Sequence, residues 1–286
     1  MLNKNIETFI GCDAEYEDAA AVIFGAPFDS TTSFRPGTRF GCRAMRSDSF
    51  GLETYSPYQD RDLTDIAVFD SGDIELPFGN PEIPLAMIEE RAAIILNDGK
   101  IPVMLGGEHL VTLGAVRAAH KKYPDLCIVH LDAHADLRED YLGVTLSHAC
   151  VMRHCHDILG DGRIYQLGIR SGAREEFDFA REGHVEMHPF NFSAAGAIAK
   201  KLDGRAVYLT IDLDVLDPSI FPGTGTPEAG GATFTELLTA ISTITGGGMN
   251  IVACDVNELS PAYDISGVST SVACKVLREL LLSVVR

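Results

Sequence analysis

The chain has 286 residues, with 41 acidic and 23 basic side chains and a formal net charge of −18 at pH 7. A surface this acidic excludes nucleic acid as the main partner, because phosphate binding needs clustered lysine and arginine, and it suits a small cationic substrate. No apolar stretch reaches the length of about 18 residues that a membrane span needs, so no membrane partner is expected. The N-terminus has no apolar signal region and the seven cysteines contain no CxxC pair, so we expect free thiols in a cytoplasmic protein.

Short apolar runs alternate with helical patterns along the chain. In chain order, the runs predicted as strands are 20–24, 66–69, 101–105, 126–131, 163–167, 206–211 and 251–254. The predicted helices are 84–97, 110–122, 147–157, 175–182, 233–245 and 266–285. This alternation predicts an α/β fold, a three-layer αβα sandwich with a mostly parallel central sheet. No linker or internal repeat divides residues 1–286, so we expect a single domain.

Two longer stretches carry neither pattern. They are residues 28–39 and 216–231, and the second is dense in glycine, proline and threonine. Long loops without secondary structure are usually functional or disordered. Because 216–231 directly follows a strand that ends in carboxylates, we expect it to be a functional loop.

Acidic side chains gather where two of the predicted strands end. Four aspartates and one histidine follow the runs 126–131 and 206–211, namely Asp132, His134, Asp136, Asp212 and Asp214. Ligands of open parallel sheets bind beyond the carboxyl ends of the strands, so these side chains are expected to converge. Clustered carboxylates repel each other unless protons or cations neutralise them. A metal site is therefore predicted at this edge of the sheet.

A second histidine belongs to the same edge. His109 closes the segment 106–109 (GGEH), which follows another predicted strand. The resulting set of four aspartates and two histidines suits manganese or a similar cation better than the Cys-rich donor sets of structural zinc. Six ligands are too many for one catalytic ion that keeps an open position. Two ions that share bridging aspartates fit this donor set.

The order and spacing of these motifs resemble the ureohydrolase (arginase/agmatinase) family. The matching segments are 106–109 (GGEH), 132–136 (DAHAD), 147–148 (SH), 212–218 (DLDVLDP) and 222–227 (PGTGTP). The segments 25–30 (GAPFDS), 35–39 (RPGTR) and 255–264 (DVNELSPAYD) extend the match over nearly the whole chain. The PAYD and RPG runs look most like the agmatinase branch, whose reaction converts agmatine and water to putrescine and urea.

The resemblance assigns roles residue by residue. One Mn²⁺ would be held by His109, Asp132, Asp136 and Asp212, and a second Mn²⁺ by Asp132, His134, Asp212 and Asp214. Asp132 and Asp212 would bridge the two ions, and Asp136 would also hydrogen-bond the attacking hydroxide. Glu258 matches the glutamate that binds the guanidinium group, and His148 matches the histidine that shuttles a proton. The family also implies a homotrimer or homohexamer.

The chain departs from the commonest forms of the family at two positions. Glu108 stands where many relatives have aspartate, and Ala149 follows His148 where many have glycine. The asparagine-bearing loop by which the arginase branch binds the α-carboxylate and α-amine of its substrate is not evident, and 137–140 (LRED) takes its place. This favours a substrate without an α-carboxylate.

Alternatives within the family remain open. Arginase, guanidinobutyrase and formimidoylglutamase would share the metal core, and Arg35, Arg39 or Arg138 could bind a substrate carboxylate. A catalytically silent regulatory homologue is disfavoured because every metal position is intact. The spacing of Cys150, His154, Cys155 and His156 matches no zinc pattern, so these residues are assigned to packing or surface. The remaining histidines, including His130 and His184, are assigned structural roles.

Overall fold

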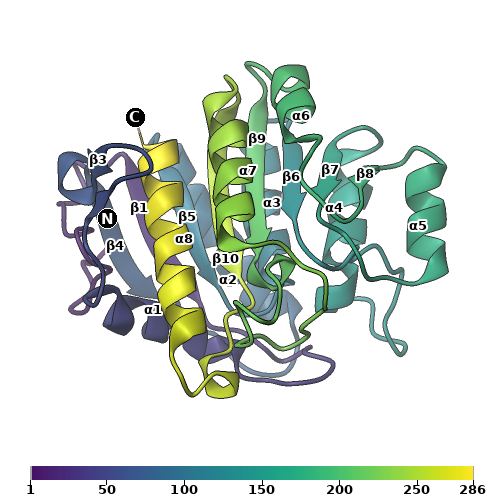
Figure 1. Ribbon diagram of the computed structural model, residues 1–286, viewed down its shortest axis with the longest axis horizontal. Helices are drawn as coiled ribbons and strands as arrows, with labels where there is room; N and C mark the ends of the chain where they lie inside the picture. The colour runs from purple at the N-terminus through teal and green to yellow at the C-terminus, as the bar shows by residue number, and fades with distance from the viewer. Residues whose placement is uncertain (1, 286) are drawn as a thin grey trace.

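The computed structural model describes residues 2–285, and its centre is an eight-stranded sheet (Figure 1). The strands are β1 (Ala21–Ala26), β4 (Val68–Asp73), β5 (Ile101–Gly106), β6 (Cys127–Leu131), β7 (Ile164–Leu167), β8 (Glu186–His188), β9 (Ala206–Asp212) and β10 (Asn250–Asn257). They lie in the order β4-β1-β5-β10-β9-β6-β7-β8. Every neighbouring pair in this sheet is parallel. A small antiparallel hairpin joins β2 (Tyr55–Ser56) to β3 (Arg61–Asp62).

Helices cover both faces of the sheet. On one face, an apolar core packs the strands against α1 (Gly41–Ser49), α6 (Ala195–Lys201), α7 (Phe234–Gly246) and α8 (Val268–Val284). On the other face, a second core packs them against α2 (Glu82–Asn97), α3 (Val111–Lys122) and α4 (Val151–Leu159), with α5 (Arg174–Arg181) at the edge beyond β8 (Figure 1). Strands buried on both faces become almost continuously apolar, as β9 is. The predicted three-layer αβα sandwich is confirmed.

The predicted elements agree with the structure in type and differ at their ends. All seven predicted strands and six predicted helices are present, and residues 216–231 carry no helix and no strand. Strand β10 runs on to Asn257, three residues beyond the predicted end. The predicted helix 147–157 begins as a separate 3₁₀ turn, His148–Cys150, so His148 precedes α4. The prediction missed β8, α1 and α6, as well as the small hairpin.

The sheet order determines where polar side chains can meet. Strands β5, β10, β9 and β6 are consecutive neighbours and parallel, so their carboxyl ends lie side by side at one edge. His109 follows β5, Asp132 follows β6, Asp212 ends β9 and Glu258 follows β10. His148 instead lies in the 3₁₀ turn before α4. Among residues 2–285, no helix is long and apolar enough to cross a membrane.

Candidate metal centre and active site

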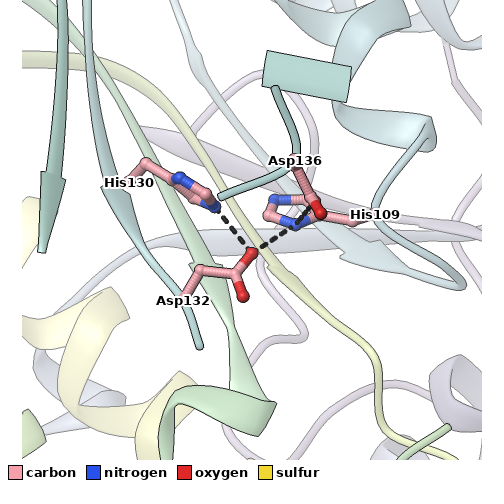
Figure 2. A group of neighbouring side chains, drawn as sticks. All are labelled: His109, His130, Asp132 and Asp136. Atoms are coloured by element: carbon pink, nitrogen blue, oxygen red, sulfur yellow. Dashed lines mark hydrogen bonds and ion pairs between the residues drawn. The ribbon is translucent and has the colours of Figure 1, made fainter. Parts of the chain in front are cut away.

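Three carboxylates converge on one imidazole nitrogen at this edge of the sheet. Nδ1 of His109 lies 3.0 Å from Oδ2 of Asp132, 3.3 Å from Oδ2 of Asp136 and 3.3 Å from Oδ2 of Asp212. Figure 2 shows His109 with two of these aspartates. This buried nitrogen has no hydrogen-bond partner although three oxygens surround it. Atoms that bind one ion at about 2.1 Å lie about 3 Å apart when they are at right angles, so the grouping fits a shared divalent ion.

A second group of ligand atoms adjoins the first. Nδ1 of His134 lies 3.0 Å from Oδ2 of Asp214 and 3.6 Å from Oδ1 of Asp132. Asp132 therefore turns Oδ2 toward His109 and Oδ1 toward His134, as a carboxylate shared by two ions would. The other oxygen of Asp212, Oδ1, accepts a hydrogen bond from the Asp214 backbone N–H at 2.8 Å. The structure thus brings all six predicted ligands together, and the bridging role of Asp212 stays a prediction.

The buried aspartates of the two ligand groups need compensating positive charge. Burial, together with the charges of Asp214 and Asp132, raises the pKa of Asp212 well above its ordinary value. Burial alone would also raise the pKa of Asp132. The imidazoles of His130, His109 and His134 instead hold this pKa well below its ordinary value. Carboxylates this close remain ionised together only when cations compensate them. The donor set therefore fits two divalent ions.

His130 belongs to the site although the sequence assigned it a structural role. It is fully buried, and its Nε2 lies 2.7 Å from Oδ2 of Asp132 (Figure 2). The side-chain amide of Gln166 donates to Nδ1 of His130 at 3.0 Å and to the carbonyl of Ala135 at 2.7 Å. The proton of His130 is therefore on Nε2, which donates to Asp132 and orients it. Its position two residues before Asp132, on the same face of the chain, was the signal in the sequence.

Two glutamates connect the metal ligands to the surrounding loops. Oε1 of Glu258 accepts a hydrogen bond from the His109 backbone N–H at 2.9 Å. Oε2 of Glu108 accepts from the backbone N–H of Thr31 at 3.0 Å and from Oγ1 of Thr32 at 2.9 Å. Burial raises the pKa of Glu108 to about 7 although these donors favour its charged form. Burial and the charges of Glu108 and Asp214 raise the pKa of Glu258 well above its ordinary value.

His148 faces the same space from a different loop. Its Nε2 lies 2.9 Å from Oγ of Ser33, and its backbone N–H donates to Oγ1 of Thr31 at 3.1 Å. Through Thr31, Glu108 thus fixes the position of His148, a role that the sequence did not reveal. Burial lowers the pKa of His148. The imidazole opens on a cavity of about 230 Å³ whose lining includes Ser33, His134, Asp136, Arg138, Tyr141, Ser171, Glu176 and Thr226.

Two of the acidic residues have an uncommon backbone conformation. Asp136 has φ 53° and Glu258 has φ 67°, the left-handed region that side chains other than glycine rarely adopt. Glu258 directly follows β10, and Asp136 lies in the loop after β6. The turn directs the carboxylate back toward the metal ligands.

The chain has the fold of a known enzyme family. A model described as the arginase family matches residues 19–283, and the chain belongs to this family. The predicted class, a hydrolase of the ureohydrolase type, is thereby confirmed. The donor groups agree with the binuclear metal chemistry of the family.

Individual relatives match over almost their whole length. An agmatinase from Bacillus subtilis is 48% identical over 281 residues, which cover 98% of this chain and 97% of the relative. A guanidinobutyrase from Pseudomonas aeruginosa is 33% identical and the match covers 94% of this chain and 87% of the relative. The crystal structure of an agmatine ureohydrolase from Thermoplasma volcanium superposes with a TM-score of 0.88 at 35% identity, covering 98% of this chain and 94% of the other.

Proposed function

We propose that this chain hydrolyses agmatine to putrescine and urea with two manganese ions. The observation that carries the proposal is the convergence of three aspartate oxygens on a buried, unpartnered nitrogen of His109, beside Glu258 and the cavity of His148. The similarity to agmatinases over the full chain supports the choice of substrate.

Two sets of residues would hold the ions. His109, Asp132, Asp136 and Asp212 would form the first, and His134, Asp214 and the shared Asp132 the second, with Asp212 as a further bridge. When bound, such a pair of ions lowers the pKa of water and so supplies a hydroxide nucleophile at neutral pH. His130 keeps Asp132 oriented by its hydrogen bond of 2.7 Å.

The protein residues bind the guanidinium group and move the proton. Oε1 of Glu258 is engaged by the His109 N–H, so Oε2 is left to accept charge-assisted hydrogen bonds from the substrate. Asp136 orients the nucleophile, which adds to the guanidinium carbon. The bond from that carbon to the alkyl nitrogen then breaks, giving urea and a primary amine. His148 delivers a proton to the leaving nitrogen, and the contact with Ser33 holds its ring in place.

A carboxylate that contacts two cavity-lining residues, His134 and Ser171, favours a cationic substrate tail. Glu228 lies beside the second metal group, with Oε1 3.9 Å from Nε2 of His134 and a side chain that is 40% exposed. Its Oε1 accepts a hydrogen bond from Oγ of Ser171 at 2.8 Å. The distal ammonium of agmatine would meet this carboxylate. Arginine would instead have to bury a carboxylate without a cationic partner, which is costly.

A single observation favours the alternative substrate 4-guanidinobutyrate. Arg138 lines the cavity and could bind a carboxylate tail. However, Nε of Arg138 lies 3.6 Å from Oε2 of the buried Glu176, so that carboxylate already compensates its charge. A carboxylate tail would have to compete with Glu176, whereas an ammonium tail would not.

Urea release from manganese-loaded protein tests the proposal on agmatine, 4-guanidinobutyrate, arginine and formimidoylglutamate. We expect kcat/KM for agmatine to exceed that for arginine by more than about 100-fold, roughly 2.7 kcal/mol. Glu228→Gln should raise KM for agmatine, whereas the matched change Arg138→Gln should not. If 4-guanidinobutyrate proves the best substrate, agmatine is the wrong assignment while the hydrolytic chemistry stands.

A homotrimeric or homohexameric assembly and a cytoplasmic location stay predictions from the family resemblance.

A further inference from the structure

Three metal-type side chains meet outside the catalytic centre, near the amino ends of β7 and β8. His156 lies in the last turn of α4, Asp161 in the loop before β7, and His184 in the loop between α5 and β8. We call them the peripheral cluster, and one ligand atom from each lies within 4.8 Å of the others. The loops of the cluster precede β7 and β8, whereas the catalytic residues follow the carboxyl ends of their strands. We propose that the peripheral cluster binds one zinc ion.

The two imidazoles point at the same carboxylate oxygen. Nε2 of His156 and Nδ1 of His184 each lie 2.8 Å from Oδ1 of Asp161. Two imidazoles and one carboxylate, with a fourth position open to water, form a donor set that zinc accepts. Bonds of about 2.0–2.2 Å in tetrahedral geometry place the ligand atoms roughly 3.3 Å apart. Each nitrogen therefore needs to move away from the Asp161 oxygen by only about half an ångström to admit the ion.

Packing holds both rings in this orientation. Phe179 stacks on His184 with the ring centroids 4.3 Å apart and meets His156 edge-on at 4.8 Å. The guanidinium carbon of Arg153 lies 4.3 Å from the centroid of Phe179. Rings that are fixed before binding lose little conformational freedom when an ion arrives, so the bound geometry is largely prepared.

The carboxylate is fixed by the backbone. Asp161 lies between Gly160 and Gly162, which have φ 81° and 71°, so the loop turns sharply at this residue. The backbone N–H of Gly162 donates to the carbonyl of His184 at 3.3 Å, which connects the loop of Asp161 to the loop of His184. The side chain of Asp161 is 66% exposed, so an ion and its water can reach it.

The outer nitrogens of both rings face carboxylates at a distance. Nδ1 of His156 is buried without a hydrogen-bond partner and lies 3.9 Å from Oδ1 of Asp157. Nε2 of His184 lies 3.7 Å from Oε2 of Glu182. Histidines that bind metal commonly direct the second ring nitrogen at a carboxylate, which makes the imidazole a better ligand. Each ring of the cluster has such a carboxylate nearby.

Zinc binding can be counted separately from the catalytic metals. Manganese-loaded protein is dialysed against micromolar Zn²⁺ at a constant Mn²⁺ concentration, and both metals are measured by elemental analysis. We expect about two manganese ions and one additional zinc ion per chain. X-ray absorption at the zinc edge should show two imidazole ligands among nitrogen and oxygen neighbours.

Two variants and a control decide the assignment. His184→Gln and Asp161→Asn should each weaken zinc binding at least about tenfold while manganese content and agmatine hydrolysis are unchanged. His188→Gln, which alters a histidine outside the cluster, should keep the additional zinc ion. Equal zinc binding in wild type and both cluster variants would overturn the proposal. Zinc uptake with a matching loss of manganese would also overturn it, because the ion would then have entered the catalytic centre.

Discussion

Replacing Glu258 by glutamine tests how this side chain binds the substrate. The two oxygens of Glu258 have separate tasks, since Oε1 accepts the backbone N–H of His109 at 2.9 Å and, within residues 2–285, no hydrogen bond reaches Oε2. In the Glu258→Gln variant the amide oxygen keeps the bond to His109, and the NH₂ group takes the place of Oε2. The substrate guanidinium would then meet a donor where it needs an acceptor.

The size of the effect follows from this exchange. A hydrogen bond to a charged group contributes about 1.5–3 kcal/mol, and a buried donor left without an acceptor adds a penalty of similar size. We take about 2.7 kcal/mol, near the upper end of the lost hydrogen bond alone, as a lower limit, which corresponds to a kcat/KM that is at least about a hundredfold lower. The metal ligands are unchanged and His109 keeps its backbone partner, so both manganese ions should remain bound.

Steady-state urea release and elemental analysis of the same preparations provide the measurement. Glu175→Gln makes the same chemical change at an exposed position and should leave kcat/KM unaltered. A Glu258→Gln enzyme with two bound ions and kcat/KM within about threefold of wild type would refute the reasoning, because Oε2 would then not be the guanidinium acceptor.

Two other predictions concern the proton path and acid stability. His148→Asn should keep both manganese ions and lower kcat, because it removes a proton donor and no ligand; loss of metal, or an unchanged kcat with intact metal, would contradict the assigned role. Hydrogen bonds from Ser266 and Ser269 lower the pKa of Asp264 from 3.8 to about 2 even though burial opposes the shift. The contribution of ionised Asp264 to the free energy of unfolding is complete above pH 3.8 and is lost as the pH falls through about 2. The difference in this free energy between wild type and Asp264→Asn, measured by urea unfolding, should therefore shrink over that interval. A difference that does not depend on pH would contradict it.

Apolar pattern predicted the strands because most of them are buried on both faces. The apolar pattern did not predict the strand residues that are polar and buried, such as those at the end of β10. Asp255 there accepts hydrogen bonds from the Tyr208 hydroxyl at 2.6 Å and from Oγ1 of Thr112 at 2.7 Å. These partners come from β9 and α3, so local sequence gives no sign that Asp255 belongs to the core. Strand β8 is missed for a simpler reason: its three residues are only half-buried.

Helix α1 was missed because an ion pair provides part of its buried face. Arg46 is buried, and its Nε lies 2.8 Å from Oδ2 of Asp70 in β4. In the sequence this arginine interrupts the apolar pattern of a helix. The metal ligands could be predicted because they follow strands, and parallel strands end at one edge. The supporting role of Glu108 depends on which neighbours it contacts, and the local sequence does not show them. For His130 the sequence offered one sign, its position two residues before Asp132.

The left-handed conformation of Asp136 and Glu258 sets stability against function at this site. A glutamate in this region costs of the order of 1 kcal/mol and an aspartate somewhat less, and glycine removes the cost. Selection for stability alone would therefore drive both positions toward residues that cannot serve as carboxylates. The presence of acids at these positions means that the chain gives up folding free energy to place two carboxylates at the site. Engineering for thermostability should therefore leave these two residues unchanged.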